Sequence, residues 1–173
     1  MMQLTYEPAF DPLHSMFRAL RLQEGLGASS RLPRDLFRIL DFYLLFPGAL
    51  QTVRFRPAHQ RLKRQAVATK RAPPYGPRPE DAVLFERMRP FQDAALETLA
   101  LRGILSNDAL EEGWVEQGDK AVQPELGERV KAANATEKDL IEALRAIAVD
   151  YQLEGTNGLK DRTGLLEHRY DAV

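Results

Sequence analysis

Three histidines are the side chains in this sequence best suited to acid–base chemistry or to zinc binding, because imidazole titrates near neutral pH and ligates metals. They are His14, His59 and His168, in three separate segments. Helix-borne metal sites pair a histidine with a second one a few residues along the chain, and none of the three has such a neighbour. The sequence also lacks cysteine, which excludes thiolate catalysis and thiolate metal sites. We therefore expect no metal and no cofactor.

Hydroxyl and carboxylate side chains could supply other catalytic chemistry. The glycines are scattered and form no phosphate-binding loop, and no serine lies in the strained elbow of a hydrolase. A triad assembled from distant residues stays open at this point. One group of carboxylates could act as acid and base or bind a hard cation, although a solvated charged face is the simpler interpretation. Its members are Glu111, Glu112, Glu116 and Asp119. The sequence thus predicts a protein that is not an enzyme.

Positive charge is concentrated between residues 51 and 79, a segment without any acidic residue. Its side chains could contact phosphate without reading base sequence, or could dock on an acidic protein. Because few aromatic residues are interleaved to stack on bases, a protein is the favoured partner. The candidate contacts are Arg54, Arg56, Arg61, Lys63, Arg64, Lys70 and Arg71, and Arg78 completes the segment.

Negative charge is concentrated in the segment from Phe91 to Glu128, where Arg102 and Lys120 are the only basic residues. The acidic residues there are Asp93, Glu97, Asp108, Glu111, Glu112, Glu116, Asp119, Glu125 and Glu128. The formal net charge of -1 conceals this segregation. An acidic surface repels DNA, whereas one basic and one acidic pole suit oriented assembly with other proteins.

The composition indicates a water-soluble globular protein. Apolar residues make up 44% of the sequence and charged residues 28%, which is ordinary for such proteins. The longest apolar run, 42–46, is too short to cross a bilayer, and the first residues lack the features of a secretory signal. A chain of 173 residues fits one domain, or one domain with an appendage. The expected location is the cytoplasm.

Helix signals dominate the pattern of elements that must position these side chains. Asp11 before Pro12 predicts an N-cap and a helix over 12–24. A second helix is expected to start near Arg34 and to end before Pro47. Its segment FRILDFYLLFP, at 37–47, is apolar on more than one face, which is typical of a helix buried at the centre of a fold. Further helices are expected from Pro57, from Glu80 with a break or kink at Pro90, from Pro124 and from Thr136.

Two short apolar pieces, 104–105 and 114–115, are separated by turn residues and predict a two-stranded hairpin. Helices followed by a hairpin are the order of a winged helix, in which the helix over 91–102 would expose Gln92, Asp93, Glu97 and Thr98. The expected fold class is mainly α with a small β-hairpin. It would comprise a winged-helix-like adaptor domain with additional helices over 1–152, and an extended C-terminal tail over 153–173.

The segment 153–173 contains isolated apolar residues among glycines and polar residues, too few to form a core. We expect it to become ordered on a partner. Deleting 156–173 should then abolish complex formation and leave the domain folded. The candidate docking residues are Leu159, Arg162, Leu165, Leu166, Arg169 and Tyr170.

Three segments also resemble a known family: YEPAFDPLHSMFRALRL at 6–22, RILDFYLLFP at 38–47 and GLKDRTGLLEHRYDAV at 158–173. They are similar to the small middle components of bacterial ABC-three-component systems, the group that includes Lamassu antiphage defence. The resemblance covers most of the chain. It rests on packing and docking motifs, so it transfers no catalytic residue.

The resemblance implies a non-catalytic, often winged-helix-like partner of two larger proteins. One is an SMC-like or Rad50-like ABC ATPase that senses foreign DNA, and the other is an effector, often a nuclease, that is inactive until triggered. The leading hypothesis is an adaptor that bridges the two in a hetero-oligomer, with any DNA contact secondary and no membrane contact. The alternative is a DNA-binding winged-helix transcriptional regulator that contacts phosphate through residues 51–79.

Overall fold

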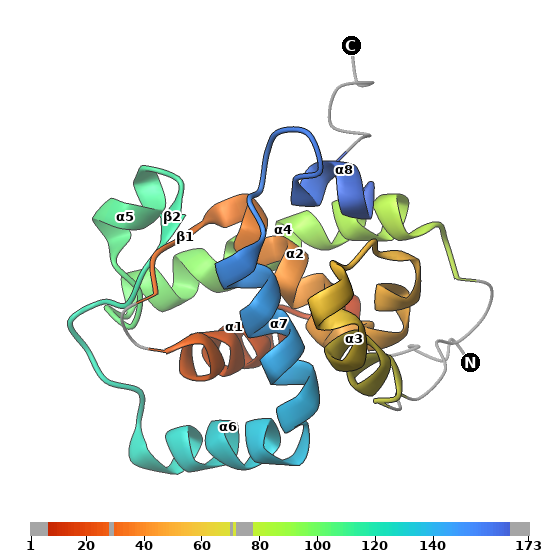
Figure 1. The fold of residues 1–173 in the computed structure, drawn as a ribbon. Coiled ribbons are helices and arrows are strands. Elements are labelled where there is room, and N and C mark those ends of the chain that lie inside the picture. The colour runs from red at the N-terminus through yellow and green to blue at the C-terminus, as the bar shows by residue number, and fades with distance from the viewer. Residues whose placement is uncertain (1–6, 28–29, 70, 72–77, 167–173) are drawn as a thin grey trace, which may run out of the picture.

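A computed structural model describes residues 7–27, 30–69, 71 and 78–166, and in these residues the chain is mainly helical with one small antiparallel sheet (Figure 1). The fold class expected from the sequence is confirmed at this level. The α-helices are α1 (Pro12–Leu26), α2 (Arg34–Leu45), α3 (Gln60–Val67), α4 (Asp81–Leu101), α5 (Asn107–Glu111), α6 (Pro124–Thr136), α7 (Lys138–Asp150) and α8 (Leu159–Thr163). The remaining elements are the 3-10 helices Pro8–Phe10, Pro47–Thr52 and Pro57–His59, and the strands β1 (Leu32–Pro33) and β2 (Trp114–Val115).

The first helix begins where the sequence predicts. The Asp11 carboxylate accepts hydrogen bonds from the backbone N–H groups of Leu13 at 2.7 Å and His14 at 3.3 Å. Pro12 occupies the first helical position, where its missing N–H has no cost. These contacts satisfy donors that the helix itself cannot pair, so the N-cap prediction is confirmed.

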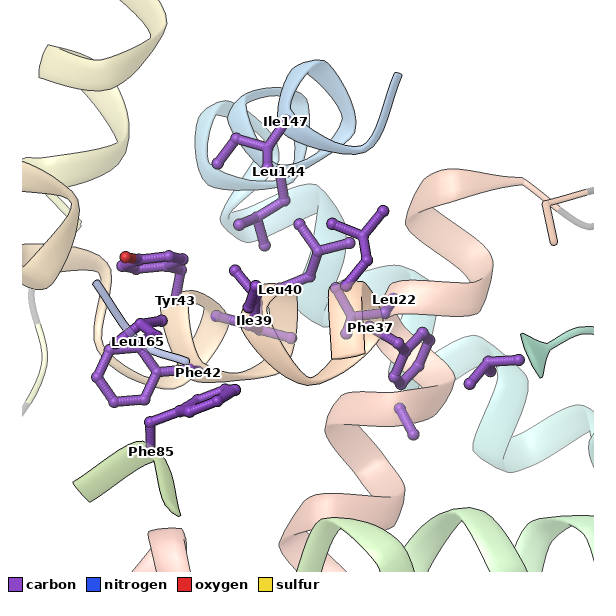
Figure 2. Packing of buried hydrophobic residues seen from close by; sticks show 14 of the residues in the cluster. Leu22, Phe37, Ile39, Leu40, Phe42, Tyr43, Phe85, Leu144, Ile147 and Leu165 are labelled. Carbon is purple, nitrogen blue, oxygen red and sulfur yellow. The ribbon is translucent and has the colours of Figure 1, made fainter. Parts of the chain in front are cut away.

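The central helix is α2, as the apolar segment predicts. Its residues from Leu36 to Leu44 are all buried. Figure 2 shows side chains of α2 directed toward α1, α4, α7 and the chain near residue 165. The ring centroid of Phe42 lies 5.9 Å from that of Phe85 in an edge-to-face arrangement. A helix that contacts neighbours on every side needs apolar residues on every side, and this explains the pattern.

Helix α4 continues through Pro90, so of the break or kink expected there, the break is wrong. A proline inside a helix removes one hydrogen bond and costs about 3 kcal/mol. Pro90 is exposed, while Phe85 and Met88 before it and Leu96 and Leu99 after it are buried in the core. Burial on both sides of the proline favours one continuous helix over two short ones.

A small antiparallel sheet is confirmed, but its pairing differs from the predicted hairpin between 104–105 and 114–115. Strand β2 pairs with β1, with Leu32 opposite Val115. Leu105 forms a single antiparallel bridge with Gln117, and the chain between them contains α5. A winged-helix relationship stays a prediction, because a strand pair this short occurs in many folds.

The N-cap of α7 is Glu137, one residue after the expected cap, Thr136. Thr136 is the last residue of α6, and its hydroxyl donates to the Ala132 carbonyl at 3.0 Å instead of capping α7. The residue between the two helices is Glu137, whose carboxylate is bound by arginines from other elements. A threonine hydroxyl that bonds one turn back is unavailable as a cap, so the expected capping box is wrong.

Residues 153–166 pack against the core, which corrects the expectation that this stretch is part of an extended tail. Leu159, Leu165 and Leu166 are buried in the same cluster as α2. A backbone hydrogen bond joins the two ends of the loop before α8: the Leu159 N–H donates to the Gln152 carbonyl at 2.8 Å. Residues 167–173 lie outside the described part of the chain, so the proposed tail is not described there.

Helices α1 and α7 pack closely together at Gly25. A Cβ atom added at this residue would lie 2.7 Å from Cγ2 of Ile141, closer than carbon atoms pack. The Gly25 carbonyl also accepts a hydrogen bond from Nε of Arg145, on α7, at 2.9 Å. Glycine at this position therefore sets the distance between the two helices.

We expect Gly25→Ala to lower the free energy of unfolding by about 1–3 kcal/mol, because the added methyl group overpacks the contact with Ile141. Gly127→Ala is the matched control, since Gly127 also lies within a helix and has nothing within 4 Å of an added Cβ. It should stabilise the protein by roughly 0.5–1 kcal/mol through helix propensity. Equilibrium unfolding in urea measures both. Equal stabilisation by the two substitutions would contradict the close approach.

Candidate interaction surfaces

The basic and the acidic segments lie on opposite sides of one core. Figure 1 shows α3, in the basic segment, well separated from α5 and β2, in the acidic segment. We call the surface of 54–64 the basic end and the surface of 107–119 the acidic end. Helices α1, α2, α4 and α7 pack between the two ends. The two ends can therefore contact different partners.

Acidic residues from elsewhere in the chain neutralise part of the basic segment. Arg54 forms an ion pair with Asp161 at 2.9 Å, and Arg71 binds the Glu137 carboxylate. Arg78 pairs with Asp81. The expectation that this segment is unopposed is therefore wrong for these three arginines. The fold brings the partners of Arg54 and Arg71 from distant parts of the sequence, whereas Asp81 lies three residues after Arg78.

The exposed charge of the basic end comes from arginines 56, 61 and 64. Among the described residues none of the three forms an ion pair, and all are exposed. The Arg56 guanidinium lies 4.8 Å from the ring centroid of Tyr151. Lys63 donates to the Val53 carbonyl at 2.8 Å. Lys70 lies outside the described residues.

The acidic end is partly neutralised by Arg31 from the loop before β1. Arg31 contacts the Glu112 carboxylate at 3.1 Å and that of Glu116 at 3.7 Å, and its guanidinium lies 5.0 Å from the Trp114 ring. Three acidic residues there are exposed and form no ion pair within the described part of the chain. They are Asp108, Glu111 and Asp119.

Gln92 is buried, so the expectation that the helix over 91–102 exposes this residue is wrong. It is 4% exposed, and its side-chain amide donates to the Asp41 carboxylate at 2.7 Å. The amide oxygen accepts from Nε of Arg38 at 3.0 Å. Of the other residues expected on that surface, Asp93 is half-buried and pairs with Arg34 at 3.1 Å. Glu97 is exposed as expected, but Gln92 and Asp93 bond to residues of α2, so this helix face is only partly free.

A buried polar network joins α1, α2 and α4, and sequence reasoning did not identify it. Nε of Arg18 lies 2.6 Å from one Asp41 oxygen, and its Nη2 lies 3.1 Å from the other. Burial, together with the nearby Arg89, lowers the pKa of Arg38. One signal was present: Arg18, Arg38 and Asp41 are charged residues within strongly apolar helical segments. Nη2 of Arg38 has no hydrogen-bond partner among the described residues and lies 3.9 Å from the Glu86 carboxylate. The paired geometry of Arg18 and Asp41 indicates a role in packing specificity rather than in chemistry.

Glu137 connects the basic segment to α1. Its carboxylate accepts from Nη2 of Arg21 at 2.7 Å and from Nη2 of Arg71 at 2.9 Å. Burial alone would raise the pKa of Glu137, but hydrogen bonds from Arg71 and Arg21 outweigh it, so the pKa is lowered. Arg71 also donates to the Leu44 carbonyl at 2.9 Å. Arg71 is thus occupied inside the fold and is a poor candidate for partner contact.

Both ring nitrogens of His59 have polar neighbours. Its Nδ1 lies 3.0 Å from the Tyr151 hydroxyl, and its Nε2 lies 3.2 Å from Asp150. The Arg56 backbone N–H also donates to that hydroxyl, at 2.8 Å. These contacts join the end of α7 to the start of α3. Within the described residues, no three His, Asp or Glu side chains are placed to hold a metal ion.

The candidate docking leucines of the C-terminal segment are buried, as described above, and so cannot contact a partner while the protein is folded in this way. Arg162 lies 5.2 Å from the Tyr151 ring and is half-buried. Arg169 and Tyr170 lie outside the described residues. Partner docking through this segment stays a prediction, and it now rests on Arg169 and Tyr170.

One family model matches residues 4–171, and its description is ABC-three component (ABC-3C) system Middle Component 5. No curated protein and no solved structure matches the chain. Within the described residues, the helices are too short or too polar to span a membrane.

Proposed function

Since the chain belongs to the Middle Component 5 family of ABC-three component systems, we propose that it is the non-catalytic adaptor of such a system, working in the cytoplasm. In this proposal it bridges an SMC-like or Rad50-like ATPase, which senses foreign DNA, and an effector such as a nuclease. The setting would be a Lamassu-like defence against phages or plasmids.

The observation that carries the bridging role is the pair of oppositely charged ends on one core (Figure 1). Arg56, Arg61 and Arg64 are exposed at the basic end, and Asp108, Glu111 and Asp119 at the acidic end. Complementary potentials steer encounters and fix which face meets which partner. A rigid core between two such ends can therefore select two different proteins and set their relative orientation.

Charge reversal at each end tests the proposal. The variants are Arg61→Glu with Arg64→Glu, and Glu111→Lys with Asp119→Lys. Each pair should weaken binding of one component by about tenfold or more at low salt and leave the other unchanged, because like charges then face each other. Binding to the separately purified ATPase component and third component measures this.

Glu142→Lys is the control, since Glu142 is exposed on α7 and belongs to neither end as defined above. It should bind both components like the wild type. If the wild-type chain binds neither component, or if both double variants lose the same one, the bridging proposal is wrong.

A DNA-binding regulator is the second candidate, favoured by the same three exposed arginines. Three phosphate contacts correspond to a slope of about -2.7 in log affinity against log salt, or roughly a 40-fold loss between 50 and 200 mM salt. A salt titration of binding to double-stranded DNA decides the matter. Absence of binding at the lowest salt concentration would end this alternative.

A further inference from the structure

An apolar groove of about 570 Å³ runs over α1, between the end of α4 and the first half of α6. Leu13, Met16, Phe17 and Leu20 line it from α1 at helical spacing. Leu99, Ile104 and Leu126 complete its apolar surface. The groove shares no lining residue with the basic and acidic ends defined above.

The floor and the mouth of this groove differ in exposure. Leu20 and Leu99 are 5% and 3% exposed, and they belong to the core. Leu13, one turn before the half-buried Met16 and Phe17, is 69% exposed. Covering a leucine removes apolar area from water, which is favourable at about 25 cal/mol per Å². A partner that fills the groove would therefore gain most from Leu13.

Two arginines flank the apolar surface. Arg102, at the end of α4, and Arg129, on α6, both line the groove and are exposed. Neither forms an ion pair with any residue that the structure describes. A segment that enters the groove with carboxylates beside its apolar face would find a complementary charge on either side.

We propose that this groove binds an amphipathic helix of one of the other two system components, with an apolar stripe and acidic residues beside it. This inference rests on the proposed function and specifies one of its contacts. Positions 13 to 20 of α1 span two helical turns, about 10 Å. The matching segment presents apolar residues at i, i+3 or i+4, and i+7.

The lining elements favour a helix over an extended segment. The groove is lined by α1, α4 and α6, and the lining residues outside these helices are Arg102, directly after α4, and Ile104. No strand lies along it among the described residues, so an extended peptide would leave its backbone N–H and C=O groups unpaired there. A helix satisfies these groups internally.

Charge also argues against a second copy of this chain as the occupant. In a twofold-symmetric contact the same surface of both copies meets, which places Arg102 and Arg129 of one copy close to those of the other. Like charges placed opposite each other at an interface are unfavourable. The arginines therefore select an acidic partner.

The test uses the full chain with each of the other two components, and the variant Leu13→Asp. It should bind one component at least about tenfold more weakly than the wild type, because a carboxylate is placed where apolar contact is needed. Val149→Asp is the matched control: Val149 is 75% exposed on α7, and it does not line the groove. It should bind both components like the wild type. Circular dichroism and thermal unfolding establish that both variants are folded.

Neutralising the rim is a second, independent variant. Arg102→Gln with Arg129→Gln should weaken binding of the same component by roughly threefold to tenfold and reduce its dependence on salt. If Leu13→Asp binds both components normally, or if it abolishes a dimer seen with the wild type, the inference is wrong. If instead the wild type binds neither component, the proposed function itself fails, so the two failures are distinguishable.

Discussion

Asp41→Ala should lower the free energy of unfolding by about 3–5 kcal/mol, because it leaves the Arg18 guanidinium buried without a counter-charge. The two side chains are 5% and 6% exposed and meet through two hydrogen bonds. The same carboxylate accepts from the Gln92 amide at 2.7 Å. Removing the carboxylate therefore leaves donors on α1 and α4 unpaired. The resulting decrease in the free energy of unfolding exceeds the net contribution of the ion pair.

Urea unfolding followed by far-ultraviolet circular dichroism measures the loss. Asp161→Ala is the control, because it breaks an exposed ion pair. In that pair the Arg54 side chain is 59% exposed and the Asp161 side chain 53% exposed. That change should cost no more than about 1 kcal/mol. Asp41→Asn keeps a polar group of the same size and should fall between the two. An Asp41→Ala variant as stable as Asp161→Ala would show that the pair is not buried in solution.

Leu165→Ala should lower the free energy of unfolding by about 2–5 kcal/mol, the range for truncating a buried leucine. Leu165 is 1% exposed, and Figure 2 shows it beside Phe42 of the central helix. The substitution removes apolar contacts and leaves a cavity that the rigid helices cannot fill. The effect tests directly whether residues 153–166 belong to the core.

Leu101→Ala is the matched control, since Leu101 is 84% exposed at the end of α4. Surface substitutions of this kind usually change stability by less than about 0.5 kcal/mol. If both leucine variants are equally stable, the segment around Leu165 is not packed as described.

The burial of Leu165 also changes how partner docking by the C-terminal segment must be tested. Deleting 156–173 removes three buried leucines, so loss of binding would not separate docking from folding. Ending the chain after Leu166 retains them and removes Arg169 and Tyr170. That shorter variant is the appropriate one for the predicted docking role.

The features predicted correctly from the sequence are those fixed by neighbouring residues. The Asp11 cap depends on N–H groups two and three residues away. The burial of α2 follows from the apolar residues on all its faces, and α6 begins at Pro124 as expected. The family resemblance depends on such segments too, and the family model spans 4–171.

The features missed or mistaken depend on residues far apart in the chain. Arg54 and Asp161 are separated by 107 positions, and Arg71 and Glu137 by 66, so counting charges in one segment could not reveal their neutralisation. Residues 153–166 have no helical or strand periodicity, and only the surface formed by α2 and its neighbours buries their leucines.

By itself, the sequence determined the helical class, the central helix and the separation of charge, because capping, periodicity and composition act over a few residues. The tertiary structure decided which charges remain exposed, where the segment after residue 152 lies and that an apolar groove opens over α1. Ion pairs and burial are set by distances between elements. Those distances result from packing the whole chain around one core, and no local pattern encodes them.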